Sequence, residues 1–282
     1  MKISTRNMNF NFNSPIVMGI LNITPDSFSD GGLYNCYDYA VKHASSMIKD
    51  GASIIDIGGE STRPGAHKVS LQQELERVIP IIKAVTKNFD VLVSVDTSKA
   101  IVMEEAYKAG VHIINDIRSL HEPGALEVAS KTGLPICIMH ILGSQKIMQK
   151  NINYKNIVSE VKKQLLNEIN RCEINGIKKN RLIIDPGFGF GKNLNHNYQL
   201  LAKLHEFNSL GVPLLVGMSR KSMIGELLNV PTNNRLVGSI SCAVIAAMKG
   251  AQIIRVHDVK ETVQAMKIVH EILLIKEMNN YE

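Results

Sequence analysis

The feature that most constrains the fold is a regular alternation of short apolar segments with longer segments of helical period. Segments rich in isoleucine, valine and leucine recur at 16–21, 53–57, 91–95, 112–114, 135–139, 181–185, 213–218 and 252–256. Between them, apolar residues return every three or four positions, as in 71–88, 156–173 and 236–250. Near-continuous apolar strands that alternate with amphipathic helices are typical of a parallel sheet covered by helices.

The number of these units predicts how the sheet closes. Eight strand-helix units within about 250 residues are the size of a closed barrel. We therefore predict the α/β class and a (β/α)8 TIM barrel. An open doubly wound sheet is the alternative, because closure leaves no direct trace in a sequence. No low-complexity linker divides the chain, so residues 1–282 are expected to form a single barrel domain.

The composition argues against several classes of protein. The four cysteines are far apart and form no C-x-x-C pair, which favours buried thiols over disulfides or zinc. No apolar segment approaches the roughly 18 residues of a membrane span, and the N-terminal segment lacks an apolar signal region. We therefore expect a cytoplasmic protein without a membrane partner.

The net charge gives little information about partners. The formal charge of +6 comes from dispersed lysines and arginines, without a basic patch. Proteins that bind nucleic acid more often carry such a patch, so no nucleic-acid partner is predicted. An anionic small-molecule substrate is compatible with the charge, and so is a mildly basic surface without a function.

Every predicted strand ends in polar side chains. The carboxyl ends of barrel strands converge on one rim, where barrel enzymes keep their active sites. One polar residue at a strand end is usually a helix cap, but eight of eight strands ending this way is hard to assign to capping. The strand-end residues are Asn22, Asp56, Asp96, Asn115, Asp116, His140, Asp185, Ser219, Arg220, Lys221, Arg255, His257 and Asp258.

The segment "DPGFGFGK" at 185–192 resembles a phosphate-binding loop but matches neither standard pattern. A dinucleotide fingerprint needs G-x-G-x-x-G, and a P-loop needs G-x-x-x-x-G-K followed by serine or threonine. Because successive side chains of a strand alternate, Asp185 shares a face with Ile183 and should point into the barrel. The glycines would allow a tight bend after it.

Two connections are longer than the usual 2 to 6 residues. They follow the first and second strands and read "NITPDSFSDGGLYN" and "GGESTRPGAHKVS". Both are rich in Gly, Pro, Ser and Thr, which favours loops that cover a substrate, with plain surface loops as the alternative.

The polar side chains divide into groups with different chemistry. Asp96, Asn115 and Asp185 supply acceptors and an amide, which suit a flat nitrogen heterocycle with several N–H donors. No Ser-His-Asp or Cys-His arrangement is evident, which argues against a covalent intermediate.

The other groups suit anions. Arg255, His257 and Asn22 are suited to a phosphate or pyrophosphate, with Mg²⁺ as the natural companion. Ser222 at the start of a helix, with Lys221 beside it, is suited to a small carboxylate. Pyrophosphate as a leaving group implies a transfer reaction.

Seven separated motifs identify a family that the chain resembles. They read "MGILNITPDSFSDGG", "GGESTRPGA", "SVDTSKA", "HIINDI", "DPGFGFGK", "GMSRKS" and "RVHDV". In this order they resemble the dihydropteroate synthases of bacterial folate biosynthesis, over nearly the whole chain. The resemblance implies a (β/α)8 barrel, usually a homodimer, and a transferase. Such an enzyme joins 6-hydroxymethyl-7,8-dihydropterin diphosphate to p-aminobenzoate and releases pyrophosphate, with Mg²⁺ as cofactor.

The resemblance also implies a role for each matching residue. The pterin would be held by Asp96, Asn115 and Asp185, with Lys221 over the ring. The diphosphate and Mg²⁺ would be held by Asn22, Thr62, Arg255 and His257. The p-aminobenzoate pocket would contain Phe28, Arg63, Pro64, Phe190 and Ser222. The first long loop would close over the site through Asp30.

The mechanism implied by the resemblance is dissociative. Arg255 and His257 would stabilise the negative charge of the departing diphosphate. The negative charges of Asp96 and Asp185 would balance the positive charge of the pterin methylene cation, and Lys221 would lie over the ring. One segment departs from the family pattern: residues 141–145, "ILGSQ", replace a run resembling Met-Gln-Gly-x-Pro. The role of this segment stays open.

Three other functions are compatible with part of the pattern. A pterin-binding barrel that transfers a methyl group to a corrinoid protein would share the Asp/Asn edge, but has no use for "STRPG" or for Arg255 with His257. A catalytically silent relative should have lost loop residues, and none is lost. A sugar-phosphate aldolase would need a Schiff-base lysine, which Lys221 imitates, but the other motifs would be unexplained.

Overall fold

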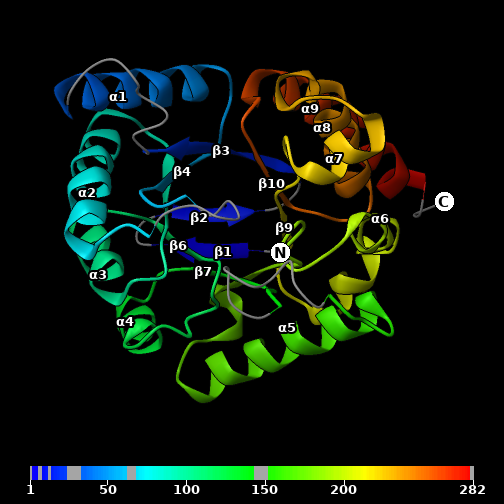
Figure 1. Cartoon of the computed structure of the whole chain (residues 1–282), viewed down its shortest axis with the longest axis horizontal. Coiled ribbons are helices and arrows are strands. Elements are labelled where there is room, and N and C mark those ends of the chain that lie inside the picture. The colour runs from blue at the N-terminus through cyan, green and yellow to red at the C-terminus, as the bar shows by residue number, and fades with distance from the viewer. Residues whose placement is uncertain are drawn as a thin grey trace.

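Eight parallel strands form a ring in the order β8-β7-β6-β5-β4-β3-β10-β9, with helices around it (Figure 1). The structure is a computed structural model that describes residues 2–5, 8–11, 14–23, 33–61, 68–142 and 152–279. The ring closes between β8 and the segment before β9. Ile184 pairs with Leu214 there, and Ile184 N donates to Pro213 O over 2.9 Å. The predicted closed barrel is therefore confirmed.

The barrel strands and the helices alternate along the chain as the sequence predicts. The strands are β3 (Ile16–Asn22), β4 (Ile54–Gly58), β5 (Leu92–Asp96), β6 (Ile113–Asp116), β7 (Ile136–Met139), β8 (Leu182–Asp185), β9 (Leu215–Val216) and β10 (Ile253–Val256). The helices are α1 (Leu33–Lys49), α2 (Leu71–Asn88), α3 (Ala100–Lys108), α4 (Ala125–Thr132), α5 (Ile157–Ile174), α6 (Leu194–Ala202), α7 (Ser222–Leu228), α8 (Leu236–Met248) and α9 (Val259–Asn279). Short 3₁₀ helices are η2 (Lys179–Arg181), η3 (Leu204–Leu210) and η4 (Thr232–Asn234).

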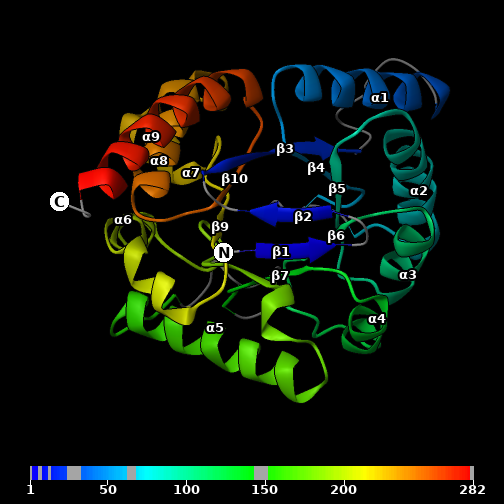
Figure 2. The ribbon, with the colours of Figure 1, turned by 180° about the vertical axis from the view of Figure 1, so that it is seen from behind.

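Two features differ from the sequence prediction. The seventh strand, predicted over 213–218, is shortened to β9; at its start Pro213 has no N–H group and Leu214 N donates to the Gln252 side chain over 2.7 Å. An antiparallel hairpin of β1 (Lys2–Thr5) and β2 (Met8–Asn11) precedes the barrel. The hairpin lies across the centre of the ring (Figure 2), and β1 contacts η2 at the start of β8. It therefore covers the amino end of the barrel and leaves the carboxyl ends of the strands to the site.

Helix α2 illustrates why the outer layer forms where it does. Ser70 accepts a hydrogen bond from Gln73 N over 3.2 Å, and the Gln73 side chain accepts from Ser70 N over 3.1 Å. This reciprocal capping box satisfies two donors at the start of the helix. Val78, Ile82 and Val85 recur at helical spacing and are buried against the strands.

The floor of the barrel is one apolar layer. Each strand contributes a single buried side chain to it: Met18, Ile54, Leu92, Ile113, Cys137, Ile183, Leu215 and Ile253. Burying each large apolar side chain stabilises the fold by about 1.5–3 kcal/mol. Residues two positions further along each strand point the same way. That next layer is polar on five strands: Asp56, Ser94, Asn115, Asp185 and Arg255.

No helix in the described part of the chain is both long enough and apolar enough to cross a membrane.

Candidate active site at the carboxyl ends of the strands

Arg255 forms the centre of an ion cluster inside the mouth of the barrel. Its Nε donates to Asp56 Oδ2 over 2.6 Å, and its Nη2 donates to Asp96 Oδ2 over 2.8 Å. Asn115 Nδ2 donates to the same Asp56 oxygen over 3.1 Å. Within the described residues, Arg255 Nη1 donates no hydrogen bond, and Asp56 Oδ1 and Ser94 Oγ make none either. The cluster joins β4, β5, β6 and β10 and leaves one guanidinium nitrogen for a ligand.

Burial and neighbouring charges shift the pKa values of this cluster. Burial raises the pKa of Asp96 to about 7; Arg255 opposes the rise and Asp56 adds to it. Burial acts to lower the pKa of Arg255, but Asp56 and Asp96 outweigh burial and raise it. The guanidinium therefore keeps its charge, while Asp96 changes its charge near neutral pH.

Asp185 and Lys221 form a second charged pair in the mouth. Burial raises the pKa of Asp185, and Lys221 opposes the rise. Burial lowers the pKa of Lys221 to about 8, and Asp185 opposes the fall. Lys221 Nζ donates to Phe188 O and lies 4.7 Å from the centroid of the Phe190 ring. This cation–π contact joins the loop after β8, which carries Phe190, to the turn after β9, which carries Lys221.

The loop of residues 186–192 depends on glycine at two close approaches. Gly187 has φ +70°, and a Cβ there would lie 1.9 Å from His140 O. Gly189 has φ +80°, and a Cβ there would lie 3.2 Å from Lys221 Cδ. Both backbone conformations favour glycine, and a side chain at Gly187 would collide with backbone. The predicted tight bend after Asp185 is confirmed.

An apolar wall adjoins this loop. The Phe190 and Met139 side chains are buried together, with Ile117 and Ile141 packed against them. These residues end or follow β6, β7 and β8, so the wall lies at the same carboxyl ends of the strands as Asn115 on β6. A flat ring in the mouth would meet polar groups at its edge and apolar groups at its face.

Asn22 lies at the end of β3 next to the ion cluster. A Cβ on Gly58 would lie 3.7 Å from Asn22 Oδ1 and 3.3 Å from Asp96 Cβ. Within the described residues, no group of three His, Cys, Asp or Glu side chains is arranged to hold a metal. A single amide oxygen fits an ion that keeps most of its water, as Mg²⁺ does when it binds mainly through substrate phosphates.

His257 is oriented by Ser219. Ser219 Oγ accepts from His257 N over 3.2 Å and lies 3.1 Å from His257 Nδ1. Because this hydroxyl already accepts from the backbone, its own proton can go to Nδ1. The Nε2–H tautomer of His257 can then donate to an anion.

The turn between β9 and α7 separates two neighbouring cations. Arg220 has φ +59°, which is rare for a residue with a side chain. Its Nε donates to Asp258 Oδ2 over 3.0 Å, and its Nη2 pairs with the other carboxylate oxygen. Arg220 therefore turns outward while Lys221 turns into the mouth. Ser222, the next residue, is exposed at the start of α7.

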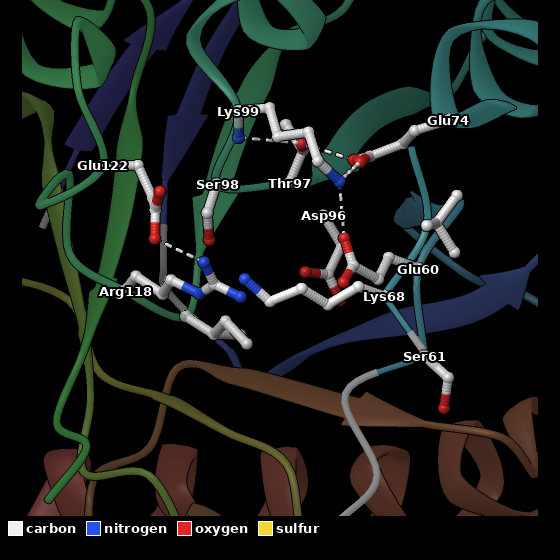
Figure 3. A pocket seen from close by; sticks show the side chains of 12 residues that line it. Glu60, Ser61, Lys68, Glu74, Asp96, Thr97, Ser98, Lys99, Arg118 and Glu122 are labelled. Carbon is white, nitrogen blue, oxygen red and sulfur yellow. Dashed lines mark hydrogen bonds and ion pairs between the residues drawn. The ribbon is translucent and has the colours of Figure 1, made fainter. Parts of the chain in front are cut away.

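A cavity of about 120 Å³ lies between the ends of β4, β5 and β6 (Figure 3). Lys99 Nζ lies between Glu60, at 2.5 Å, and the buried Glu74. The side chains of Lys68 and Arg118 extend toward each other across the cavity. The Glu74–Lys99–Glu60 chain fixes the point where the second long loop begins, and no sequence pattern had indicated it.

The structure brings most of the described predicted residues together. Arg255 directly joins the heterocycle side of the site to the side predicted for phosphate. Asp56, which had no predicted role, accepts from two residues of the site. His140, predicted at the rim, directly follows β7 at the carboxyl ends of the strands and is buried beneath the glycine loop. Phe28, Asp30, Thr62, Arg63, Pro64 and most of segment 141–145 lie outside the described residues.

Comparison with known proteins identifies the family. The family model described as "Pterin binding enzyme" matches residues 18–257. The dihydropteroate synthase of Escherichia coli strain K12 is 59% identical over 282 residues, which cover 100% of both chains. The Yersinia pestis dihydropteroate synthase in a sulfonamide drug complex is 59% identical with a TM-score of 0.92, covering 96% of this chain and 98% of that one. The Xanthomonas albilineans enzyme in complex with 7,8-dihydropteroate is 40% identical with a TM-score of 0.88, covering 97% and 99%.

A closed barrel with a charged and apolar mouth at the carboxyl ends of its strands is the arrangement of TIM-barrel enzymes. This chain belongs to the pterin-binding enzyme family.

Proposed function

We propose that the chain is a dihydropteroate synthase, a transferase of folate biosynthesis. It joins 6-hydroxymethyl-7,8-dihydropterin diphosphate to p-aminobenzoate and releases pyrophosphate. The observation that carries this proposal is the mouth itself, where buried Asp96, Asn115 and Asp185 surround Arg255 and adjoin the Phe190 wall. The full-length identity to dihydropteroate synthases supports it.

The pterin is the ligand that fits the polar layer. Its ring edge carries N–H donors, and ionised carboxylates accept such donors. Asp185 and Asp96 accept from the ring edge, and the Asn115 amide contributes a further polar contact. Lys221 and Phe190 lie against the ring, with their mutual 4.7 Å contact holding both in place.

The diphosphate is held on the side of Asn22 and His257. His257 Nε2–H and Arg255 Nη1 donate to its oxygens, and the family resemblance assigns a further contact to Thr62. Asn22 would supply an oxygen to Mg²⁺, which would neutralise charge on the leaving group when bound. The C–O bond to the pterin methylene breaks and its electrons leave with the diphosphate. The negative charges of Asp96 and Asp185 stabilise the cation left on the pterin.

The aniline nitrogen of p-aminobenzoate then attacks the methylene. Its lone pair is free at neutral pH, so the nitrogen forms the new C–N bond and afterwards releases a proton to solvent. The family resemblance assigns its pocket to Phe28, Arg63, Pro64, Phe190 and Ser222, of which Phe190 and Ser222 lie in the described part of the chain.

Ser222 provides a separate test of that pocket. A hydrogen bond to a carboxylate contributes about 1.5–3 kcal/mol. We expect Ser222→Ala to raise the KM for p-aminobenzoate about 10- to 100-fold and leave the Kd of the pterin diphosphate unchanged. Steady-state kinetics and titration calorimetry measure the two constants. A loss of pterin diphosphate binding instead would move the carboxylate pocket elsewhere.

The pKa values predict a narrow pH optimum. Below pH 7 Asp96, with its pKa of about 7, gains a proton and loses an acceptor. Above pH 8 Lys221, with its pKa of about 8, loses its positive charge. We expect kcat/KM for the pterin diphosphate to fall on both sides, about tenfold per pH unit. Asp96→Asn should remove the acid limb; an unchanged acid limb in that variant would assign it to another group.

Sulfonamides should compete with p-aminobenzoate, because they present a similar aniline and anion. We expect a sulfonamide to raise the apparent KM for p-aminobenzoate and leave the maximal rate unchanged. Inhibition that added p-aminobenzoate does not relieve would contradict a shared pocket.

The enzyme would act as a cytoplasmic homodimer. Cys137, Cys172 and Cys242 are buried free thiols, as suits a reducing compartment. Exposed apolar side chains gather on the neighbouring helices α7, α8 and α9, among them Val237 at 75% and Ile268 at 66% exposure. Such a surface suits an isologous interface between two copies. Light scattering should give twice the chain mass, and a charged replacement of Val237 should reduce it to one.

The product tests the reaction class. Purified protein with both substrates and Mg²⁺ should form 7,8-dihydropteroate, identified by mass. Methyltetrahydrofolate with a corrinoid acceptor should give no methyl transfer. Methyl transfer without dihydropteroate would favour the other pterin-binding activity.

A further inference from the structure

Lys192 is a buried lysine held by neutral groups. It is 3% exposed, and its Nζ lies 2.9 Å from His140 Nδ1, 2.8 Å from Gly187 O and 2.9 Å from Phe190 O. Burial lowers the pKa of Lys192, and the charge of Asp185 opposes the fall. In its ammonium form Lys192 has three N–H donors, which match these three acceptors. No carboxylate forms an ion pair with Lys192 within the described residues. A buried lysine without such a partner is unusual and needs an explanation.

The surroundings keep His140 available as an acceptor. Burial and the charge of Lys192 lower the pKa of His140 to about 2, so its ring stays neutral. Tyr154 packs over this ring at 6.2 Å between centroids, and its hydroxyl donates to Gly191 O over 3.1 Å. Lys192 Nζ is therefore enclosed by the His140 ring and the backbone carbonyls of the 187–191 loop.

The backbone that Lys192 holds carries three groups of the proposed pterin site. Gly187 N donates to Asp185 Oδ1 over 2.7 Å. Phe188 O accepts from Lys221, and Phe190 bears the aromatic face. Glycine loses more conformational freedom on ordering than any other residue, so a segment with three glycines needs contacts to fix it. The ammonium supplies two of these contacts, at the first glycine and at Phe190.

We propose that Lys192 is a positioning residue for pterin recognition: it fixes the 187–191 backbone so that Asp185, Phe190 and Lys221 keep their mutual geometry. This inference rests on the proposed function and names a residue that does not itself reach the mouth. Its three donors go to His140 and the loop backbone, so its effect on the ligand is transmitted through the loop.

The test is the Kd of 6-hydroxymethyl-7,8-dihydropterin diphosphate with Mg²⁺, measured on folded protein. Lys192→Met retains the apolar stem and removes all three donors. We expect its Kd to rise at least tenfold. Val85→Ala, a cavity-forming change in α2 on the far side of the ring, is the stability control and should lower Tm with an unchanged Kd.

A second variant separates positioning from stability and covers the case in which Lys192→Met folds poorly. Lys192→Met with His140→Leu removes both polar partners, so Tm should recover part of its loss. The Kd should stay raised, because the Gly187 and Phe190 carbonyls still lack their donor. An unchanged Kd in folded Lys192→Met, or recovery of Kd together with Tm in the double variant, would overturn the proposal. Absence of binding by the unaltered protein would overturn the proposed function instead.

Discussion

Arg255→Met should abolish most activity and also destabilise the fold. Arg255 lies between two buried carboxylates, with donor distances of 2.6 Å to Asp56 and 2.8 Å to Asp96. Removing one partner of a buried ion pair costs about 3–5 kcal/mol, because the other charge is left unpaired. The variant also loses the cation that balances the diphosphate, so we expect kcat/KM to fall by a factor of about 1,000 or more.

A double variant separates these two effects. Asp56→Asn combined with Arg255→Met removes one of the stranded charges, so the free energy of unfolding should partly recover. The activity should not recover, because the leaving group still lacks its cation. Thermal unfolding and steady-state kinetics give both quantities. Recovery of activity together with stability would show that Arg255 acts only as a structural counter-ion.

Asp185→Asn should chiefly weaken binding of the pterin diphosphate. Asp185 is buried, and one of its oxygens already accepts from Gly187 N over 2.7 Å. The second oxygen is the one we assign to the pterin edge. An amide in its place can present a donor to a donor, so we expect the Kd to rise about 100-fold, or about 3 kcal/mol.

Asn115→Ala is the companion variant. In the unaltered protein the Asn115 amide donates to Asp56 over 3.1 Å. Truncation to alanine therefore removes a pterin contact and also loosens the ion cluster. We expect a smaller rise in Kd than for Asp185→Asn. Calorimetric titration measures both values. Intact binding in both variants would remove these residues from the pterin edge.

The repeating pattern of the sequence predicted the barrel because each strand carries its own local signal. The alternation of side chains along a strand also predicted which way the site residues point. Asn115 points into the mouth, whereas its neighbour Asp116 accepts hydrogen bonds from the backbone N–H groups of Arg118 and Leu120. The resemblance supplied the substrates, which the residues alone suggested only as a heterocycle, a pyrophosphate and a carboxylate.

Contacts between distant segments were harder to predict. Asp56 and Arg255 are 199 positions apart, and nothing local marks them as partners. Alternation along β4 could have located Asp56, because it lies two positions after the floor residue Ile54. Lys192 had no such signal: a lysine after a glycine is typical of an exposed loop. Its polar contact is with His140, which follows β7 and is 52 positions away in the sequence.

The most direct test of the proposed reaction is pyrophosphate release by the purified protein with Mg²⁺ and saturating dihydropterin diphosphate, with and without p-aminobenzoate. Release that depends on p-aminobenzoate, with one dihydropteroate formed per pyrophosphate, is the result we predict. Tight pterin binding without any release that responds to p-aminobenzoate would contradict the synthase assignment.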